Sequence, residues 1–112
     1  MNIMVSYADI NAMAQTLRGC FGADSVLLFG SYARQEATDD SDVDILVVMP
    51  HEIADEGGLY LAMRKILASR WPMPLDLVIR SRDAVTKWHS VPYSLIHEAM
   101  KDGKVLYARK PV

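Results

Sequence analysis

The segment of residues 42–49, DVDILVVM, constrains the fold of this chain more than any other. Its last five residues are apolar, three of them are β-branched, and Pro50 follows, which predicts a buried β-strand. The same segment begins with two carboxylates, Asp42 and Asp44. Side chains alternate between the faces of a strand, so both acids are expected on one face. Two like charges held side by side at a partly buried position repel each other, which calls for a bound cation.

Helical and strand patterns alternate along the rest of the chain. Ser6 with Asp9 three residues later predicts a capped helix that ends near Gly19 or Gly22. The other expected elements are a strand at residues 25–30, a short helix from residue 31, a helix from residue 56 to Pro72, a strand at residues 74–80, a helix at residues 94–103, and a last strand or extended arm at residues 104–110. We therefore expect an α/β fold with a sheet of three to four strands and helices packed mainly on one face.

Length and composition narrow the class of protein. A chain of 112 residues, 51% hydrophobic and 23% charged, is expected to form a single folded domain over residues 1–112. The net charge of −2 argues against a partner as large as duplex nucleic acid, although not against a single nucleotide. One cysteine, no signal-peptide pattern and no apolar run of ~20 residues predict a cytoplasmic protein without a membrane segment.

A third acid repeats the pattern of the first two. Asp76 interrupts the apolar run PLDLVI, where a charge has no packing role. If that strand lies beside residues 42–49, three carboxylates converge. Carboxylate oxygens are ligands that Mg²⁺ prefers, and three of them on adjacent strands are typical of a two-metal site for phosphoryl chemistry.

Gly30 and Ser31 lie between an expected strand and an expected helix. Glycine lets the backbone approach a ligand closely, and free amides with a hydroxyl at a helix start favour an anion such as a triphosphate. A phosphate site ten residues from a metal site indicates in-line transfer of a nucleotidyl group, with pyrophosphate leaving.

The segment GSYARQEATDDSDVDILVV resembles the signature of the minimal nucleotidyltransferases of the DNA polymerase beta superfamily. The matching positions are Gly30, Ser31, Ala33, Arg34, Ser41, Asp42 and Asp44. Asp76 resembles that family's third catalytic carboxylate, and DGKVLYAR, residues 102–109, resembles its C-terminal segment. The resemblance covers nearly the whole chain and implies the nucleotidyltransferase fold, with a small mixed sheet.

The same resemblance implies the roles of the site residues. Asp42, Asp44 and Asp76 would be catalytic and would bind two Mg²⁺ ions. Gly30, Ser31 and Arg34 would bind the nucleotide, with ATP as the substrate. Arg34 has a second interpretation from its neighbours, a salt bridge with Glu36 or Asp40. Gln35 departs from the family, which has glycine there, and leaves the local turn and the nucleotide preference open.

The resemblance also implies a partner. Stand-alone units of this family pair with a HEPN-domain ribonuclease toxin and silence it by transferring AMP to a tyrosine. Two alternatives are transfer to a small-molecule acceptor and a non-catalytic antitoxin that acts by contact. Neither the acceptor, the number of nucleotides transferred, the choice of triphosphate nor a homo-oligomeric state follows from the sequence. Tyr60, Trp88 and Tyr93 are candidates for an interface, whereas Arg64 and Lys65 are expected to be exposed charges.

Overall fold

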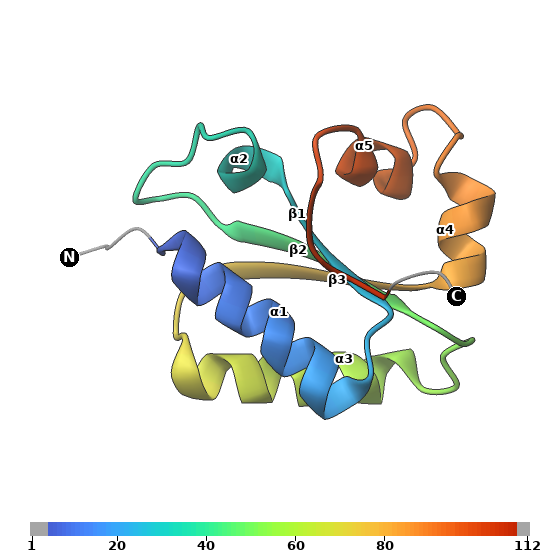
Figure 1. Cartoon of the computed structure of the whole chain (residues 1–112), viewed down its shortest axis with the longest axis horizontal. Helices are drawn as coiled ribbons and strands as arrows, with labels where there is room; N and C mark the ends of the chain where they lie inside the picture. Colours follow the sequence, from blue (N-terminus) through green and yellow to red (C-terminus); the bar gives the residue numbers. More distant parts are fainter. Residues whose placement is uncertain (1–4, 110–112) are drawn as a thin grey trace.

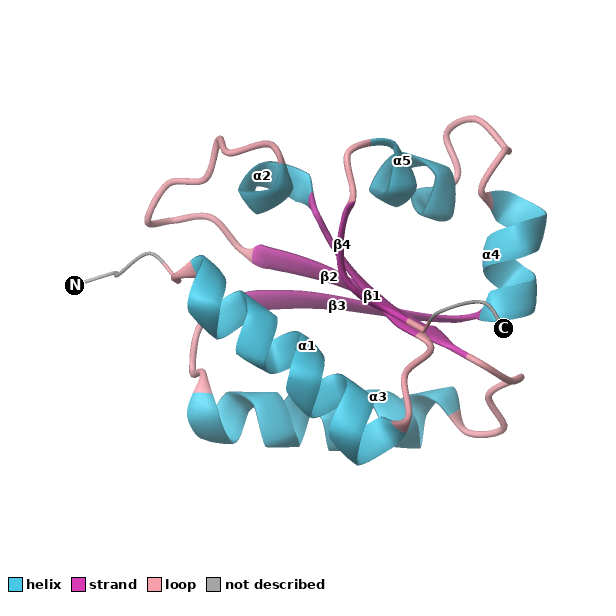
Figure 2. Ribbon diagram, in the orientation of Figure 1, coloured by secondary structure: helices cyan, strands magenta, loops and turns pink. Residues whose placement is uncertain are grey.

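The computed structural model describes residues 5–109 and has a four-stranded mixed sheet with helices around it (Figures 1 and 2). The elements in chain order are α1 (Tyr7–Phe21), β1 (Ser25–Phe29), α2 (Gly30–Ala33), β2 (Val43–Met49), α3 (Glu56–Arg70), β3 (Leu75–Ser81), α4 (Arg82–Trp88), α5 (Leu95–Lys101) and β4 (Lys104–Ala108). The strands lie in the order β3-β2-β1-β4. β2 and β3 are parallel, while β1 is antiparallel to both of its neighbours. The expected α/β class with a small sheet of three to four strands is confirmed, but helices lie on both faces of the sheet rather than mainly on one, because α4 and α5 cover the second face.

The two long helices begin where polar side chains cap them. The Ser6 hydroxyl accepts the Asp9 amide at the start of α1, as the capping pattern predicts, and the Asp55 carboxylate accepts the Gly58 amide at the start of α3. The expected end of α1 is also confirmed, because Gly22 terminates it with a φ of 70°. Gly58 lies in the first turn of α3, so the polar loop before this helix is shorter than its composition indicates.

Each face of the sheet has its own core. The long helices α1 and α3 cover one face, and the larger core lies there, built on Ile10, Leu17, Ile45, Met63 and Leu67 among others. On the opposite face, α4 and α5 cover a smaller core in which Leu27, Leu46, Val48 and Ala99 are buried. The second face is the one that positions the candidate site, because the acidic side chains of β2 and β3 share it.

The helix α4 was not predicted from the sequence. Its cap is Ser81, whose hydroxyl accepts the Ala84 amide, with Asp83 in the first turn and Lys87 in the last. These residues form a helix signal, but it follows directly on a strand with no intervening turn residue.

The ambiguity at the C-terminus is resolved in favour of a strand. β4 pairs with β1, and the arm of residues 104–110 is thereby part of the sheet as far as Ala108, while residue 110 lies outside the described part. Within residues 5–109, no helix is both long and apolar enough to cross a membrane.

Candidate active site

Asp44 and Asp76 are direct register partners on the parallel strands β2 and β3. Asp44 alternates with Leu46, and Asp76 with Val78, so both acids lie on the face that carries the smaller core. The negative charge of each carboxylate therefore acts on the other across the two strands. The expectation that the third acid lies beside the strand of the first two is therefore confirmed.

Asp42 lies one residue before β2 rather than inside it. Its side chain and that of Asp76 are exposed, and only Asp44 is half-buried. The cost of burial expected for all three acids thus falls on Asp44 alone. The strand pattern still places Asp42 two residues from Asp44, near enough for its charge to act on that carboxyl.

The pKa of Asp44 is raised from 3.8 to about 6. Burial is the largest cause, followed by the negative charges of Asp76 and Asp42 and by the hydrogen bond to Asp76, while the positive charge of Arg34 acts in the opposite direction. A carboxyl crowded by two others holds a proton more tightly because ionisation adds a third like charge. The site therefore carries an excess of negative charge that a cation would relieve.

The donor set suits a hard divalent cation, although the side chains are not yet arranged around one. Among residues 5–109, no three His, Cys, Asp or Glu side chains form a ready-made metal site. The observation that favours a cation is the Asp44–Asp76 register pair, because two carboxyls on neighbouring strands repel each other once both are ionised. Asp44 and Asp76 would hold the ion, with the exposed Asp42 as the third carboxylate of the set.

Gly30 faces this acid pair from the end of β1. Its φ is 71°, a left-handed conformation that favours glycine, and a Cβ built there would lie 2.0 Å from Oδ2 of Asp44. Ser31 follows in the first turn of α2, half-buried. The amides of a first helical turn have no partner within the helix. Glycine at this position thus lets the backbone at the start of α2 approach the Asp44 carboxylate closely.

The turn after α2 contains the residue that departs from the family pattern. Gln35 has a φ of 59°, so a side-chain-bearing residue occupies a conformation that glycine adopts without strain. The preceding Arg34 pairs with Glu36, with 3.1 Å between Nε and Oε2, and lies 3.8 Å from Oδ2 of Asp102. The salt-bridge interpretation of Arg34 with Glu36 is confirmed, and Asp102 is a partner that was not foreseen.

Arg64 corrects an expectation. Predicted as an exposed charge on α3, it is half-buried and donates from a guanidinium nitrogen to the carbonyl of Leu75, the residue before Asp76. This contact ties α3 to the start of β3 and so supports the position of Asp76. The available signal was its place beside Met63 at the edge of the buried stripe of α3.

Comparisons with known proteins find similar sequences and folds. Residues 11–112 match the family described as polymerase beta, nucleotidyltransferase. The protein adenylyltransferase MntA of Thermococcus cleftensis is 36% identical over 72 residues, which cover 64% of this chain and 71% of that protein.

Two solved structures have the same fold. A toxin–antitoxin structure with AMP-PNP superposes with a TM-score of 0.67 at 22% identity, covering 95% of this chain and 76% of that one. A complex of a tri-AMPylated Shewanella oneidensis HEPN toxin with an MNT antitoxin gives a TM-score of 0.62 at 22% identity, covering 92% and 72%. The match to the family over nearly the whole chain decides the assignment: this chain belongs to the polymerase beta nucleotidyltransferase family.

Proposed function

We propose that this protein is an Mg²⁺-dependent nucleotidyltransferase that transfers AMP from ATP to a tyrosine of a HEPN ribonuclease toxin and thereby acts as its antitoxin. The observation that carries the proposal is the register of Asp44 with Asp76, opposite a glycine whose missing Cβ leaves room for Asp44. Crowded carboxylates beside a glycine backbone that can approach a ligand closely suit a metal–triphosphate complex.

Each site residue has a role in this proposal. Asp42, Asp44 and Asp76 hold the metal, with two ions as the expected number. Gly30 and Ser31 present their amides and a hydroxyl to the triphosphate, and Arg34, whose positive charge already acts on Asp44, balances the phosphates. When bound, Mg²⁺ would neutralise phosphate charge and lower the pKa of the acceptor hydroxyl.

The transfer step balances without any other reactant. The tyrosine oxygen forms a bond to the α-phosphorus of ATP, the bond from that phosphorus to the bridging oxygen of the β-phosphate breaks, and pyrophosphate leaves. The proton of the hydroxyl passes to the exposed carboxylate of Asp76 and then to water. Alignment of the hydroxyl, the phosphorus and the leaving oxygen is the contribution that a rigid sheet edge can make.

The acceptor is proposed to come from a separate protein. Residues 1–112 are proposed to be one minimal nucleotidyltransferase domain. Support for a HEPN toxin comes from the relatives, since one is named a protein adenylyltransferase and one similar structure is a HEPN toxin with its MNT antitoxin. AMP-PNP in another similar structure supports ATP as the donor.

A labelling experiment tests the proposal. The protein is incubated with α-labelled ATP, Mg²⁺ and the product of the adjacent open reading frame, and label on a tyrosine of that partner is the expected result. The double variant Asp42→Asn, Asp44→Asn should abolish labelling. Asp39→Asn, which removes an exposed loop carboxylate near the site, is the matched control and should label at the normal rate.

The same variants separate the two alternatives. If the double variant neutralises the toxin as well as the parent protein does, the antitoxin acts by contact and the enzymatic proposal is wrong. If the partner is never labelled while pyrophosphate is released in the presence of small hydroxylated or amino compounds, the acceptor is a small molecule.

A further inference from the structure

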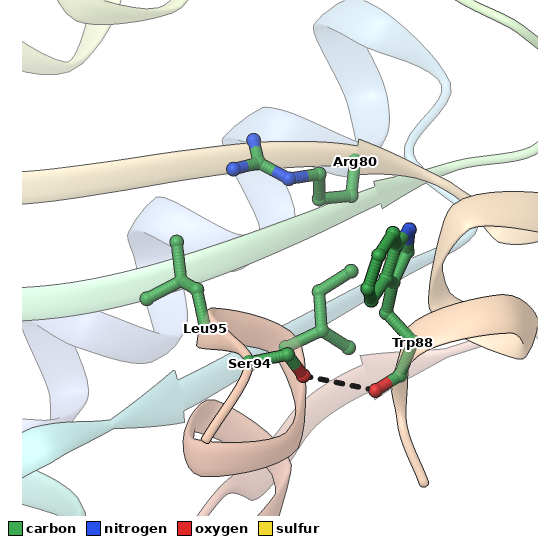
Figure 3. A pocket seen from close by; sticks show the side chains of 5 residues that line it. Arg80, Trp88, Ser94 and Leu95 are labelled. Atoms are coloured by element: carbon green, nitrogen blue, oxygen red, sulfur yellow. Dashed lines mark hydrogen bonds between the residues drawn. The ribbon is translucent and has the colours of Figure 1, made fainter. Parts of the chain in front are cut away.

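A pocket of about 190 Å³ lies between β3, α4 and α5, away from the acid pair. Figure 3 shows Arg80, Trp88 and Leu95 reaching into one space from these three elements. Ser94 and Ile96 complete the lining, and the Ser94 hydroxyl is already donated to the Trp88 carbonyl at 3.0 Å. One guanidinium nitrogen of Arg80 donates a hydrogen bond to the Ile79 carbonyl at 2.8 Å. A guanidinium has five N–H donors, so the others can bind a ligand.

The pocket lies on the same face of the same strand as the site. Asp76, Val78 and Arg80 alternate along β3, so all three project to the face of the smaller core. Arg80 comes four positions after Asp76, a distance of about 13 Å at the usual rise per residue of a strand. An extended polypeptide lying along β3 would therefore span both positions with three to four of its own residues.

Exposed apolar side chains are concentrated in the chain segment that lines the pocket. Of the nine large apolar side chains that are exposed among the described residues, five lie between residues 88 and 100. Trp88 is 42% exposed, Leu95 48% and Tyr93 92%, and Tyr93 also has a φ of 66°, which is strained for a non-glycine residue. Only Trp88 and Leu95 of these five residues line the pocket, so the segment carries more exposed apolar side chains than the pocket alone uses.

Two cationic side chains lie beside this surface. The Arg80 guanidinium lines the pocket, and the Lys87 ammonium lies 5.5 Å from the centroid of the Trp88 ring. Tryptophan, tyrosine and arginine together are the residue types that dominate the binding energy of protein interfaces. Apolar walls with a cation at one side fit an apolar side chain that has a carboxylate next to it.

We propose that the α4–α5 pocket docks the acceptor protein. An apolar side chain of the acceptor enters between Trp88 and Leu95, an adjacent carboxylate pairs with Arg80, and the hydroxyl that receives AMP lies three to four residues away, at Asp76. This inference rests on the proposed function for the existence of an acceptor protein, and it adds where that protein binds and which side chains it must present.

The first test measures binding without nucleotide, so that it does not depend on catalysis. The dissociation constant for the product of the adjacent open reading frame is measured by calorimetry with Leu95→Asp and with Arg80→Glu. Each should weaken binding at least tenfold. The matched controls are Leu61→Asp and Lys65→Glu on α3, at the opposite face of the sheet, and these should change the dissociation constant less than twofold.

A second measurement separates the other occupants of the pocket. The affinity for Mg²⁺-ATP should be the same in Leu95→Asp, Arg80→Glu and the parent protein. Loss of ATP affinity would assign the pocket to the base, and loss of self-association in size-exclusion chromatography would assign it to a second copy of this chain. Unchanged partner binding, or no binding by the parent protein, would overturn the proposal directly.

Failure of docking and failure of the proposed function give different results. Pocket-dependent binding without any labelling contradicts AMP transfer and leaves the docking surface in place. Labelling whose KM for the partner does not respond to Leu95→Asp or Arg80→Glu contradicts the docking surface and leaves AMP transfer in place.

Discussion

The carboxylates at the two ends of the sheet have opposite electrostatic surroundings. At the end where β2 and β3 finish, Asp24 is nearly buried and pairs with Arg82 through two hydrogen bonds, one of them 3.0 Å from Nε to Oδ2. This pairing raises the pKa of Arg82 above its usual value. At the end where these strands begin, Asp44 faces Asp76 and Asp42, and its pKa rises to about 6. We call the first the matched end, because its carboxylate is paired with a cation, and the second the acid-pair end, because its carboxylates face each other.

The backbone repeats this contrast. Gly22, at the matched end, has a φ of 70°, and Gln35, at the acid-pair end, has a φ of 59°. A glycine adopts that conformation freely, whereas glutamine is strained in it. Strain and unmatched charge gather where a ligand is proposed to bind, which is the usual distribution when binding rather than folding sets the local requirement.

Replacing one aspartate by asparagine at each end should give the largest difference between the two ends, in both the rate of AMP transfer and the stability of the fold. Asp44→Asn is expected to lower AMP transfer by about a thousandfold, as loss of a group that stabilises the transition state does. Without metal at pH 7, however, it should stabilise the fold by about 1 kcal/mol, because it removes the repulsion. Rates of labelling and urea unfolding measure the two effects.

Asp24→Asn is the matched control for that exchange. It should leave transfer unchanged and destabilise the fold by about 1 kcal/mol, because Arg82 loses its charged partner. If both variants destabilise the metal-free protein equally, the contrast between the two ends is wrong.

The next largest difference in stability is expected when the glycine at each end is replaced by alanine. Gly30→Ala should destabilise the fold by about 3 kcal/mol, because the new Cβ would lie 2.0 Å from Oδ2 of Asp44 in addition to the strained φ. Gly22→Ala has the same φ but nothing within 4 Å, so it should lose only about 1 kcal/mol. Equal losses by thermal or urea unfolding would mean that Asp44 moves aside without cost.

The pH dependence of stability should also originate at the acid-pair end. The folded pKa of Asp44 is raised from 3.8 to about 6, so between these values the folded protein binds more protons than the unfolded chain. Its contribution is present below pH ~4 and is lost as the pH rises through ~6, a change of about 1 kcal/mol after allowance for solvent screening. Unfolding free energies measured at several pH values, without metal, should show this fall in the parent protein.

Two controls belong to that measurement. Asp44→Asn should abolish this part of the fall, and Mg²⁺ should flatten it, because the ion stabilises the ionised carboxylates. A fall that persists unchanged in Asp44→Asn would have to come from another group.

The smallest expected effect is relief of strain at the turn. Gln35→Gly should stabilise the fold by about 0.5 kcal/mol, because the gain from an unstrained left-handed residue exceeds the added entropy of the unfolded chain. Chemical denaturation can resolve a change of this size. Lower stability in the variant would indicate that the Gln35 side chain contributes contacts that outweigh the strain.

Local chemistry made much of the fold predictable. The capping hydroxyl of Ser6 and the glycine at residue 22 bound α1 as their positions predict, and Asp44 takes the face that strand alternation requires. The same local rules failed for α4, whose start follows β3 without a break, and for Arg64, whose partner is eleven residues away on another element. Hydrophobic periodicity predicts the helix or strand to which a residue belongs. It does not predict which other element that helix or strand packs against.

The sequence by itself determined most of the elements, although not α4, as well as the face on which Asp44 and Asp76 lie and the family resemblance, because these depend on alternation, capping and spacing along the chain. Only the tertiary structure decided that Asp76 is the register partner of Asp44, that residues 104–108 close the sheet against β1, and that Arg80, Trp88 and Leu95 meet around one pocket. The reason is physical: strand pairing and core packing join residues far apart in the chain, and their free energies depend on all the elements together.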